Sequence, residues 1–157
     1  MKIQLVVIGK TTEKWVKEGI EKYFGRIKRY LTFEEKVIPD VKNAGKMTTE
    51  EIKRLEGNAL LKNLENSDQV VLLDENGKTF SSREFSAVVE KQMIRGCRRL
   101  IFVIGGAWGV SEEVARRADM QVSLSSMTFS HQLVRLVFAE QLYRALTIIN
   151  NEPYHHD

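Results

Sequence analysis

The chain has 157 residues, of which 43% are hydrophobic and 29% are charged. We expect one folded domain spanning residues 1–157, because this length and composition support a hydrophobic core and exclude an intrinsically disordered chain. The formal charge of +3 is compatible with a nucleic-acid partner but is too small to establish one. A lone cysteine, Cys97, excludes an intrachain disulfide and a cysteine-based zinc site, so we expect a protein of the reducing cytoplasm. No apolar stretch is long enough to cross a bilayer.

Strand and helix patterns alternate along the chain. Apolar runs rich in β-branched residues predict strands, and apolar residues at helical spacing predict helices. Two capping boxes, Thr48–Glu51 and Ser81–Glu84, mark helix starts. In chain order we expect a strand at 2–8, a helix at 13–30, a strand at 32–38, a loop at 40–46, a helix from 48 to about 64, a strand at 69–73, a turn at 74–78, a helix from 81 ended by Gly96, a strand at 100–104, a short helix at 111–117, a strand at 120–124, a long helix at 131–150 and a tail at 152–157.

This alternation predicts an α/β fold with a mainly parallel sheet flanked by helices. Ligands of such folds bind at the carboxyl ends of the strands. The segments that follow Leu73, Ile104 and Leu124 are therefore the candidate binding loops.

Paired glycines follow the strand that ends at Ile104, in the run IGGAWG. Glycine lets the backbone approach a ligand closely, although a plain tight turn accounts for the pair equally well. The run matches neither the P-loop nor the Rossmann spacing. The next candidate loop, SLSSMTFS at 123–130, carries no charge, and Met127 and Phe129 offer apolar walls. We therefore expect a neutral slot suited to a nucleoside without phosphates.

The long helix at 131–150 is apolar around almost its whole circumference. Such a helix must be buried on most sides, either at the centre of a monomer or, as we infer, against a second copy in a homodimer. Glu140 and Arg144 stand four residues apart and share one face. They form either a surface ion pair or a pair beside the active site, where Arg144 would hold a phosphate or carbonyl of the substrate. Arg135 is a weaker candidate for the same role.

Three stretches, IGGAWG, SLSSMTFSHQLVRLVFAEQLYRA and NNEPYHHD, together resemble the family of ribosomal RNA large subunit methyltransferases H, within the SPOUT class. The likeness extends over essentially the whole chain. It implies an α/β knot with a C-terminal trefoil knot, S-adenosylmethionine as cofactor, a homodimer and no metal. It also implies methylation of N3 of a pseudouridine in large-subunit (23S) rRNA, on the assembled ribosome. A non-enzymatic ribosome-associated factor on the same fold, or a small-molecule enzyme, are the alternatives.

The resemblance also implies site residues. The backbone at Gly105 would lie against the cofactor, His155 would act as the base or orient the uracil edge, and Tyr154 would stack on or hydrogen-bond the base. His131 would shape the pocket, and we interpret Trp108 as a packed aromatic rather than a lid. Ser130, where relatives have proline, is a good N-cap for the helix that follows. The implied cofactor-binding residues are Leu73, Gly105, Leu124, Ser125, Ser126, Met127, Thr128 and Phe129, and the implied catalytic residues are His155, Tyr154, Arg144 and Glu140.

Basic residues offer contacts to rRNA phosphates, although solvated faces explain any one of them equally well. They are Arg26, Lys28, Arg29, Arg95, Arg98 and Arg99.

Overall fold

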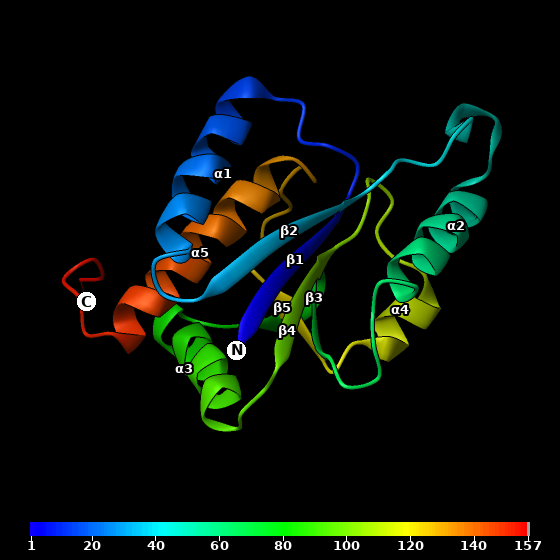
Figure 1. Ribbon diagram of the computed structural model, residues 1–157. Coiled ribbons are helices and arrows are strands. Elements are labelled where there is room, and N and C mark those ends of the chain that lie inside the picture. Colours follow the sequence, from blue (N-terminus) through cyan, green and yellow to red (C-terminus); the bar gives the residue numbers. More distant parts are fainter. Residues whose placement is uncertain (157) are drawn as a thin grey trace.

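The computed structural model describes residues 1–156 and alternates strands with helices along the chain (Figure 1). The last tail residue, Asp157, lies outside the described residues. The elements are β1 (Lys2–Ile8), α1 (Lys14–Ile27), β2 (Thr32–Ile38), a 3-10 turn (Ala44–Lys46), α2 (Thr49–Leu61), β3 (Gln69–Thr79), α3 (Ser82–Ile94), β4 (Arg99–Ile104), α4 (Glu112–Arg117), β5 (Met120–Ser123) and α5 (Leu133–Ile149).

The five strands form one sheet in the order β2-β1-β4-β3-β5, and every neighbouring pair is parallel. The predicted α/β class with a parallel sheet is therefore confirmed. Strand β4 lies at the centre, and its side chains alternate between the two faces because successive residues of a strand point in opposite directions. Phe102 joins the core on one face and Val103 joins the core on the other.

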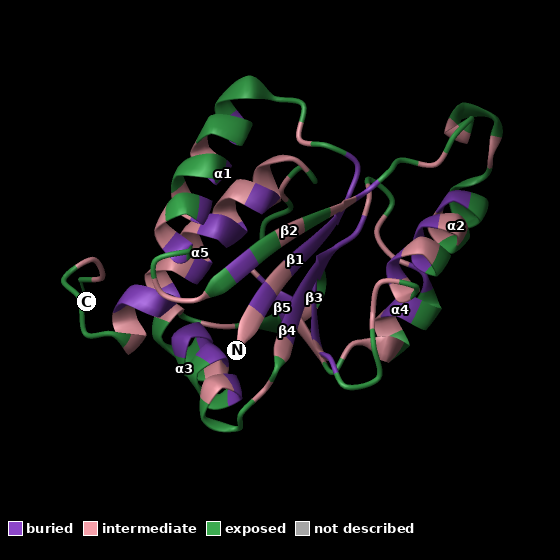
Figure 2. Cartoon of the chain, viewed as in Figure 1, coloured by how far each residue is buried: buried purple, intermediate pink, exposed green. Residues whose placement is uncertain are grey.

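Helices cover both faces of the sheet (Figure 1). Helices α1, α3 and α5 cover one face, with α5 packed against both α1 and α3. Helices α2 and α4 cover the other face. The central strands and the inner sides of the helices are buried (Figure 2). Phe138, Leu142 and Leu146 of α5 are fully buried against the sheet, so this last helix is part of the main core.

The predicted helix boundaries hold where local chemistry sets them. Both capping boxes are formed: Ser81 Oγ accepts from the Glu84 backbone N–H, while Glu84 accepts from the Ser81 N–H, and Thr48 and Glu51 repeat the arrangement. After α3 the chain turns through Gly96, whose φ of +71° favours glycine. These contacts satisfy backbone groups that helix ends leave without partners.

The turn predicted at 74–78 is wrong, because strand β3 continues through this segment to Thr79. Leu73 and Lys78 both pair with Val122 of β5, so the residues between them form an irregularity in an otherwise parallel ladder. A Cβ on Gly77 would lie 2.6 Å from backbone atoms of Val122, so only glycine fits this close approach. The irregularity carries Asp74 and Glu75 to the carboxyl edge of the sheet.

The outward side of α5 differs from an ordinary surface helix. No residue from Leu133 to Ile149 is classed as exposed, and its outward apolar residues, such as Val137 and Ile148, are half-buried in the single chain. This burial pattern is compatible with the predicted homodimer. The homodimer and the C-terminal trefoil knot both stay predictions.

Arg99, one of the basic residues considered for rRNA, is engaged within the protein. Its guanidinium pairs with Glu65 at 2.7 Å and with the buried Asp68 at 2.9 Å, which ties the start of β4 to the segment before β3. The exposed Arg95 and Arg98 lie beside it in the sequence. Arg99 is therefore a structural residue rather than a phosphate contact.

Candidate functional site

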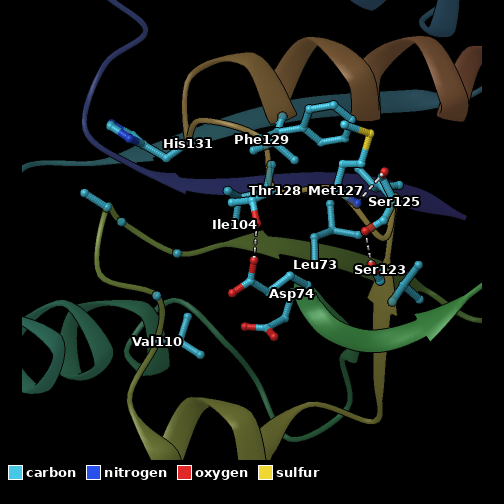
Figure 3. A pocket seen from close by; sticks show the side chains of 18 residues that line it. Leu73, Asp74, Ile104, Val110, Ser123, Ser125, Met127, Thr128, Phe129 and His131 are labelled. Carbon is cyan, nitrogen blue, oxygen red and sulfur yellow. Dashed lines mark hydrogen bonds between the residues drawn. The ribbon is translucent and has the colours of Figure 1, made fainter.

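A cavity of about 210 Å³ opens at the carboxyl ends of β3, β4 and β5, where the fold predicts a ligand (Figure 3). Three segments surround it, one following each strand. The lining comprises residues 73–75, residues 104–110 except Trp108, residues 122–129 except Ser126, and also His131 and Val134.

The structure brings the sequence-predicted cofactor residues together around this cavity, with one exception. Seven of the eight line it, and Ser126 does not. His131, predicted to shape the pocket, also lines it. No ligand contact tests these residues, so their role in binding a cofactor stays a prediction.

The loop between β5 and α5 is held by its own hydroxyl groups. Ser123 donates to the carbonyl of Ser125 at 2.8 Å, and the Ser125 hydroxyl accepts from the Met127 N–H at 2.9 Å. Ser130 Oγ accepts from the Leu133 N–H at 3.1 Å, so Ser130 caps the turn that leads into α5, whereas Gln132, directly before the helix, makes no side-chain cap. Local hydrogen bonds therefore give this uncharged loop a defined shape, with Met127 and Phe129 on the cavity wall.

The need for glycine at position 105 has a different cause from the expected approach of a cofactor. A Cβ on Gly105 would lie 2.9 Å from the backbone of Gly109 and 2.7 Å from the Val110 side chain. The loop folds back on itself, with the Gly109 N–H donating to the Gly106 carbonyl at 3.1 Å and Gly109 at φ +82°. Glycine at position 105 is therefore already required by the protein's own backbone, before any ligand is considered.

Trp108 lies at the tip of this folded-back loop and is 58% exposed. The interpretation of Trp108 as a packed aromatic is therefore wrong. The tight turn between Gly106 and Gly109 carries the indole away from the core instead of into it.

Glu56 of α2 lies behind the glycine loop and was missed from the sequence. Its carboxyl group is so close to Gly106 that a Cβ there would lie 2.6 Å from Oε2. Glu56 is buried, and Oε2 has no hydrogen-bond partner among the described residues. Burial, together with the charge of Asp40, raises the pKa of Glu56. A signal was available, because Glu56 interrupts the apolar stripe formed by Ile52 and Leu60.

The expectation of a neutral slot is wrong as well. Asp74 and Glu75 line the cavity; the segment after Leu73 was predicted to be a binding loop, but its two carboxylates were not taken into account. Thr128 of the opposite loop donates to Glu75 Oε2 at 2.8 Å (Figure 3). The cavity therefore has an acidic wall, and the described lining residues include no lysine or arginine.

Arg135 does not face a substrate. It is fully buried, and its guanidinium donates to the carbonyls of Ile8 at 2.5 Å and Gly9 at 2.8 Å, and to the Thr11 hydroxyl at 3.2 Å. A further bond from Nε reaches the His131 carbonyl at 3.1 Å. The weaker candidate for holding substrate is therefore a structural clamp between β1 and the start of α5.

The four sequence-predicted catalytic residues form a second cluster, near the carboxyl end of α5. Arg144 pairs with Glu140 at 2.5 Å and contacts His155 Nδ1 at 3.2 Å. Tyr154 donates to Glu140 Oε1 at 3.1 Å, and its ring lies 4.8 Å from the Arg144 guanidinium carbon. Burial, with hydrogen bonds to Tyr23 and Glu140, raises the pKa of Tyr154, so it stays a hydrogen-bond donor at neutral pH. The pair at Glu140 and Arg144 is thus part of a half-buried network.

A hollow lined by aromatic and basic side chains adjoins this cluster. The Arg26 guanidinium lies 5.3 Å from the centre of the Tyr143 ring, and Tyr30 donates to Glu152 at 2.6 Å. Arg29 also lines the hollow, and no ion pair of its guanidinium is found within residues 1–156. Among the described residues neither Arg26 nor Arg29 forms an ion pair, although Glu152 also lines the hollow, and guanidinium groups of this kind are suited to binding an anion.

The cavity and the catalytic cluster lie at opposite ends of α5. Val134 lines the cavity, while Glu140 and Arg144 of the cluster follow six and ten residues later, which corresponds to ~9 Å and ~15 Å along the helix axis. The chain ends beyond the far end of α5 (Figure 1). One chain therefore assembles both groups of predicted residues but does not bring the groups into contact.

The fold and this crevice define an α/β protein with a ligand site at the strand ends, and comparison with known proteins gives the family. Residues 1–155 match the family model described as "Predicted SPOUT methyltransferase". The chain belongs to the SPOUT methyltransferase family.

Several relatives carry one name. The chain is 55% identical to the Ribosomal RNA large subunit methyltransferase H of Christiangramia forsetii, over 99% of each chain. It is 51% identical to the protein of the same name from Parabacteroides distasonis, over the full length of both. Among solved structures it is similar in fold, at 13% identity and a TM-score of 0.53, to a probable methylase family protein from Haemophilus influenzae, covering 99% of this chain and 70% of that one.

No described helix is both long enough and apolar enough to span a membrane. No three described histidine, cysteine, aspartate or glutamate side chains gather in a group that would hold a metal ion.

Proposed function

We propose that this protein is a methyltransferase that uses S-adenosylmethionine to methylate N3 of a pseudouridine in large-subunit rRNA, on the assembled ribosome in the cytoplasm. The observation that carries the proposal is the cavity at the carboxyl ends of β3, β4 and β5, in a chain of the SPOUT methyltransferase family. The names of the relatives support the choice of large-subunit rRNA. The proposal treats residues 1–157 as one methyltransferase domain with the trefoil knot.

The chemistry of the cavity fits this methyl donor. Ile104, Val110 and Phe129 offer apolar surface to an adenine ring, and the loop at 124–129 offers backbone N–H and C=O groups to its edge. The lining lacks the basic side chains that a triphosphate requires, and its carboxylates suit a cation. When bound there, the donor would supply an electrophilic methyl group on a positively charged sulfur.

The separation of the two groups within one chain supports a site shared with a second copy. Methyl transfer needs reacting atoms about 3–3.5 Å apart, whereas in one chain Glu140 and Arg144 of the cluster lie ~9 Å and ~15 Å along α5 from Val134 on the cavity wall. In the proposed homodimer, the cluster of one protomer would face the cavity of its partner. The half-buried apolar residues on the outward side of α5 support this arrangement, because a second copy would complete their burial.

The hydrogen bonds of the cluster favour an orienting role for His155 over that of a base. Arginine has no acceptor, so the contact between Arg144 and His155 makes Nδ1 the acceptor, and a neutral imidazole then carries its proton on Nε2. In that tautomer Nε2–H would be a hydrogen-bond donor, and a uracil carbonyl is an acceptor of the matching chemistry. Arg144 would stabilise the negative charge that spreads onto the carbonyl oxygens as N3 loses its proton. Glu140 holds Arg144 and Tyr154 in place.

The hollow lined by Arg26 and Arg29 would hold rRNA phosphates close to the target base. Each phosphate contact adds affinity that falls as salt rises. With a formal charge of only +3, the chain has a small electrostatic footprint, which supports recognition of an assembled ribosomal surface rather than naked RNA.

Two measurements test the proposal. Isothermal titration calorimetry should register binding of S-adenosylmethionine, and mass mapping of rRNA from cells lacking the gene should show one pseudouridine without its methyl group. Restoring the gene should restore the methyl group. An unchanged modification pattern refutes the enzyme assignment, and absence of binding heat together with ribosome association would instead favour the non-enzymatic factor.

A further inference from the structure

The acidic wall of the cavity has no role in the proposed reaction so far. Asp74 and Glu75 are the only carboxylates among the lining residues, all of which lie within the described chain, and they come from the irregular middle of β3. They stand on the wall of a cavity whose other lining residues are apolar or glycine, apart from the hydroxyl groups of Ser123, Ser125 and Thr128 and the imidazole of His131 (Figure 3). Two carboxylates on the cavity wall therefore contribute an electrostatic interaction to the binding of any charged ligand.

Both carboxylates are fixed by hydrogen bonds. Asp74 Oδ1 accepts from the backbone N–H of Asn76 at 2.8 Å and from its side-chain amide at 3.0 Å. Glu75 Oε2 accepts from Thr128, so it also links β3 to the loop on the opposite side of the cavity. Their positions are therefore set before a ligand enters, and binding does not have to order two mobile side chains.

Methyl transfer changes the charge of the occupant. The carbon–sulfur bond of the sulfonium breaks and its electron pair stays on sulfur, which becomes a neutral thioether. The N3 lone pair forms the new carbon–nitrogen bond, and the proton of N3 leaves to solvent. The methyl donor and its product therefore differ by one positive charge and one methyl group, while their ammonium and carboxylate groups are the same.

From this we infer that Asp74 and Glu75 are charge-discriminating residues, which favour the cationic methyl donor over its neutral thioether product. The inference depends on the proposed function, because it takes S-adenosylmethionine as the ligand. A fixed carboxylate attracts the sulfonium and gains nothing from the thioether, so the product is bound less tightly than the donor and is exchanged more readily.

The test removes the charges and keeps the hydrogen bonds. Asp74→Asn and Glu75→Gln each retain a side-chain oxygen that accepts the observed bonds. Calorimetry would measure the Kd of S-adenosylmethionine, of S-adenosylhomocysteine and of sinefungin, an unreactive analogue with an amine-bearing carbon in place of the methylated sulfur. The ratio of the product's Kd to the donor's Kd cancels any general loss of fit. Glu90→Gln, an exposed carboxylate on α3, is the matched control.

We expect each single variant to lower this ratio about 2- to 5-fold and the double variant to lower it more, as for partly exposed charge pairs. Sinefungin should follow S-adenosylmethionine, because it carries the positive charge without the reactive methyl group. The control should leave the ratio unchanged. An unchanged ratio in the double variant overturns the inference while the wild-type protein still binds the donor, whereas failure of the wild type to bind any of the three ligands overturns the proposed function itself.

Discussion

Two inactive variants should restore each other's activity when they share a dimer. Gly105→Val disrupts the cavity, because the new side chain would meet the Gly109 backbone at 2.9 Å, and it leaves the catalytic cluster intact. His155→Ala damages the cluster and leaves the cavity intact, because His155 contacts Arg144, which lies ~15 Å along α5 from Val134 on the cavity wall. If the site is shared between protomers, a mixed dimer has one complete site: the cavity of the His155→Ala protomer with the cluster of the Gly105→Val protomer.

The size of the effect follows from counting sites. Loss of one positioned donor lowers turnover on the order of 10²-fold, so each variant alone should retain about 1% of wild-type activity or less. Random mixing of equal amounts makes half the dimers mixed, each with one complete site of two, so roughly one quarter of wild-type activity should return. The assay is methyl incorporation into ribosomes after subunit exchange, with exchange verified by native mass spectrometry. Activity no higher than the average of the separate variants, in samples that contain mixed dimers, would refute the shared site.

Three further expectations concern stability and RNA binding. Because burial raises the pKa of Glu56, the contribution of Glu56 to stability is fully present below the unfolded-state pKa and is lost as pH rises through the folded-state pKa. The variant Glu56→Gln should therefore melt a few degrees higher than wild type at pH 7 and show no advantage near pH 4. Equal melting temperatures of variant and wild type at both pH values would contradict this reasoning. Gly105→Val should cost about 1–3 kcal/mol of unfolding free energy by overpacking, as measured by urea denaturation. Gly25→Ala, in the last turn of α1 where a Cβ meets nothing within 4 Å, should instead stabilise the protein by about 0.5–1 kcal/mol. A Gly105 variant as stable as wild type would show that the loop yields. Arg29→Gln should raise the KM for ribosomes and reduce the slope of log affinity against log salt concentration by about 1. Arg54→Gln, on α2 at the opposite face of the sheet, is the control that should change neither quantity. An unchanged slope in the Arg29 variant would show that the hollow does not bind RNA phosphates.

Most of the fold could be predicted from local sequence patterns. Helical spacing, β-branched runs and two capping boxes depend on neighbours a few residues apart, so the sequence predicts the order of elements and most of their ends. The rule that ligands bind at the carboxyl ends of parallel strands then joined Leu73, Gly105 and the loop at 124–129, which do line one cavity.

The misses arise where the outcome depends on distant partners. Asp74 and Glu75 belong to a turn by composition, and only pairing with β5 makes their segment part of a strand. Arg135 was a candidate for holding the substrate, yet its guanidinium is buried and donates to carbonyls at the end of β1. The separation of the cavity from the cluster could have been predicted from the sequence, because a helix of about twenty residues is ~30 Å long.

The clamp formed by Arg135 has a consequence for biosynthesis. Its guanidinium joins carbonyls at positions 8 and 9 to a helix that is made more than 120 residues later, as a contact with Ile8 spans 127 positions. A nascent chain that still lacks α5 leaves those carbonyls without this donor and the cavity without its His131 and Val134 wall. Contacts between such distant positions slow folding, and we expect the cavity to be complete only once α5 has been synthesised and has packed against the sheet.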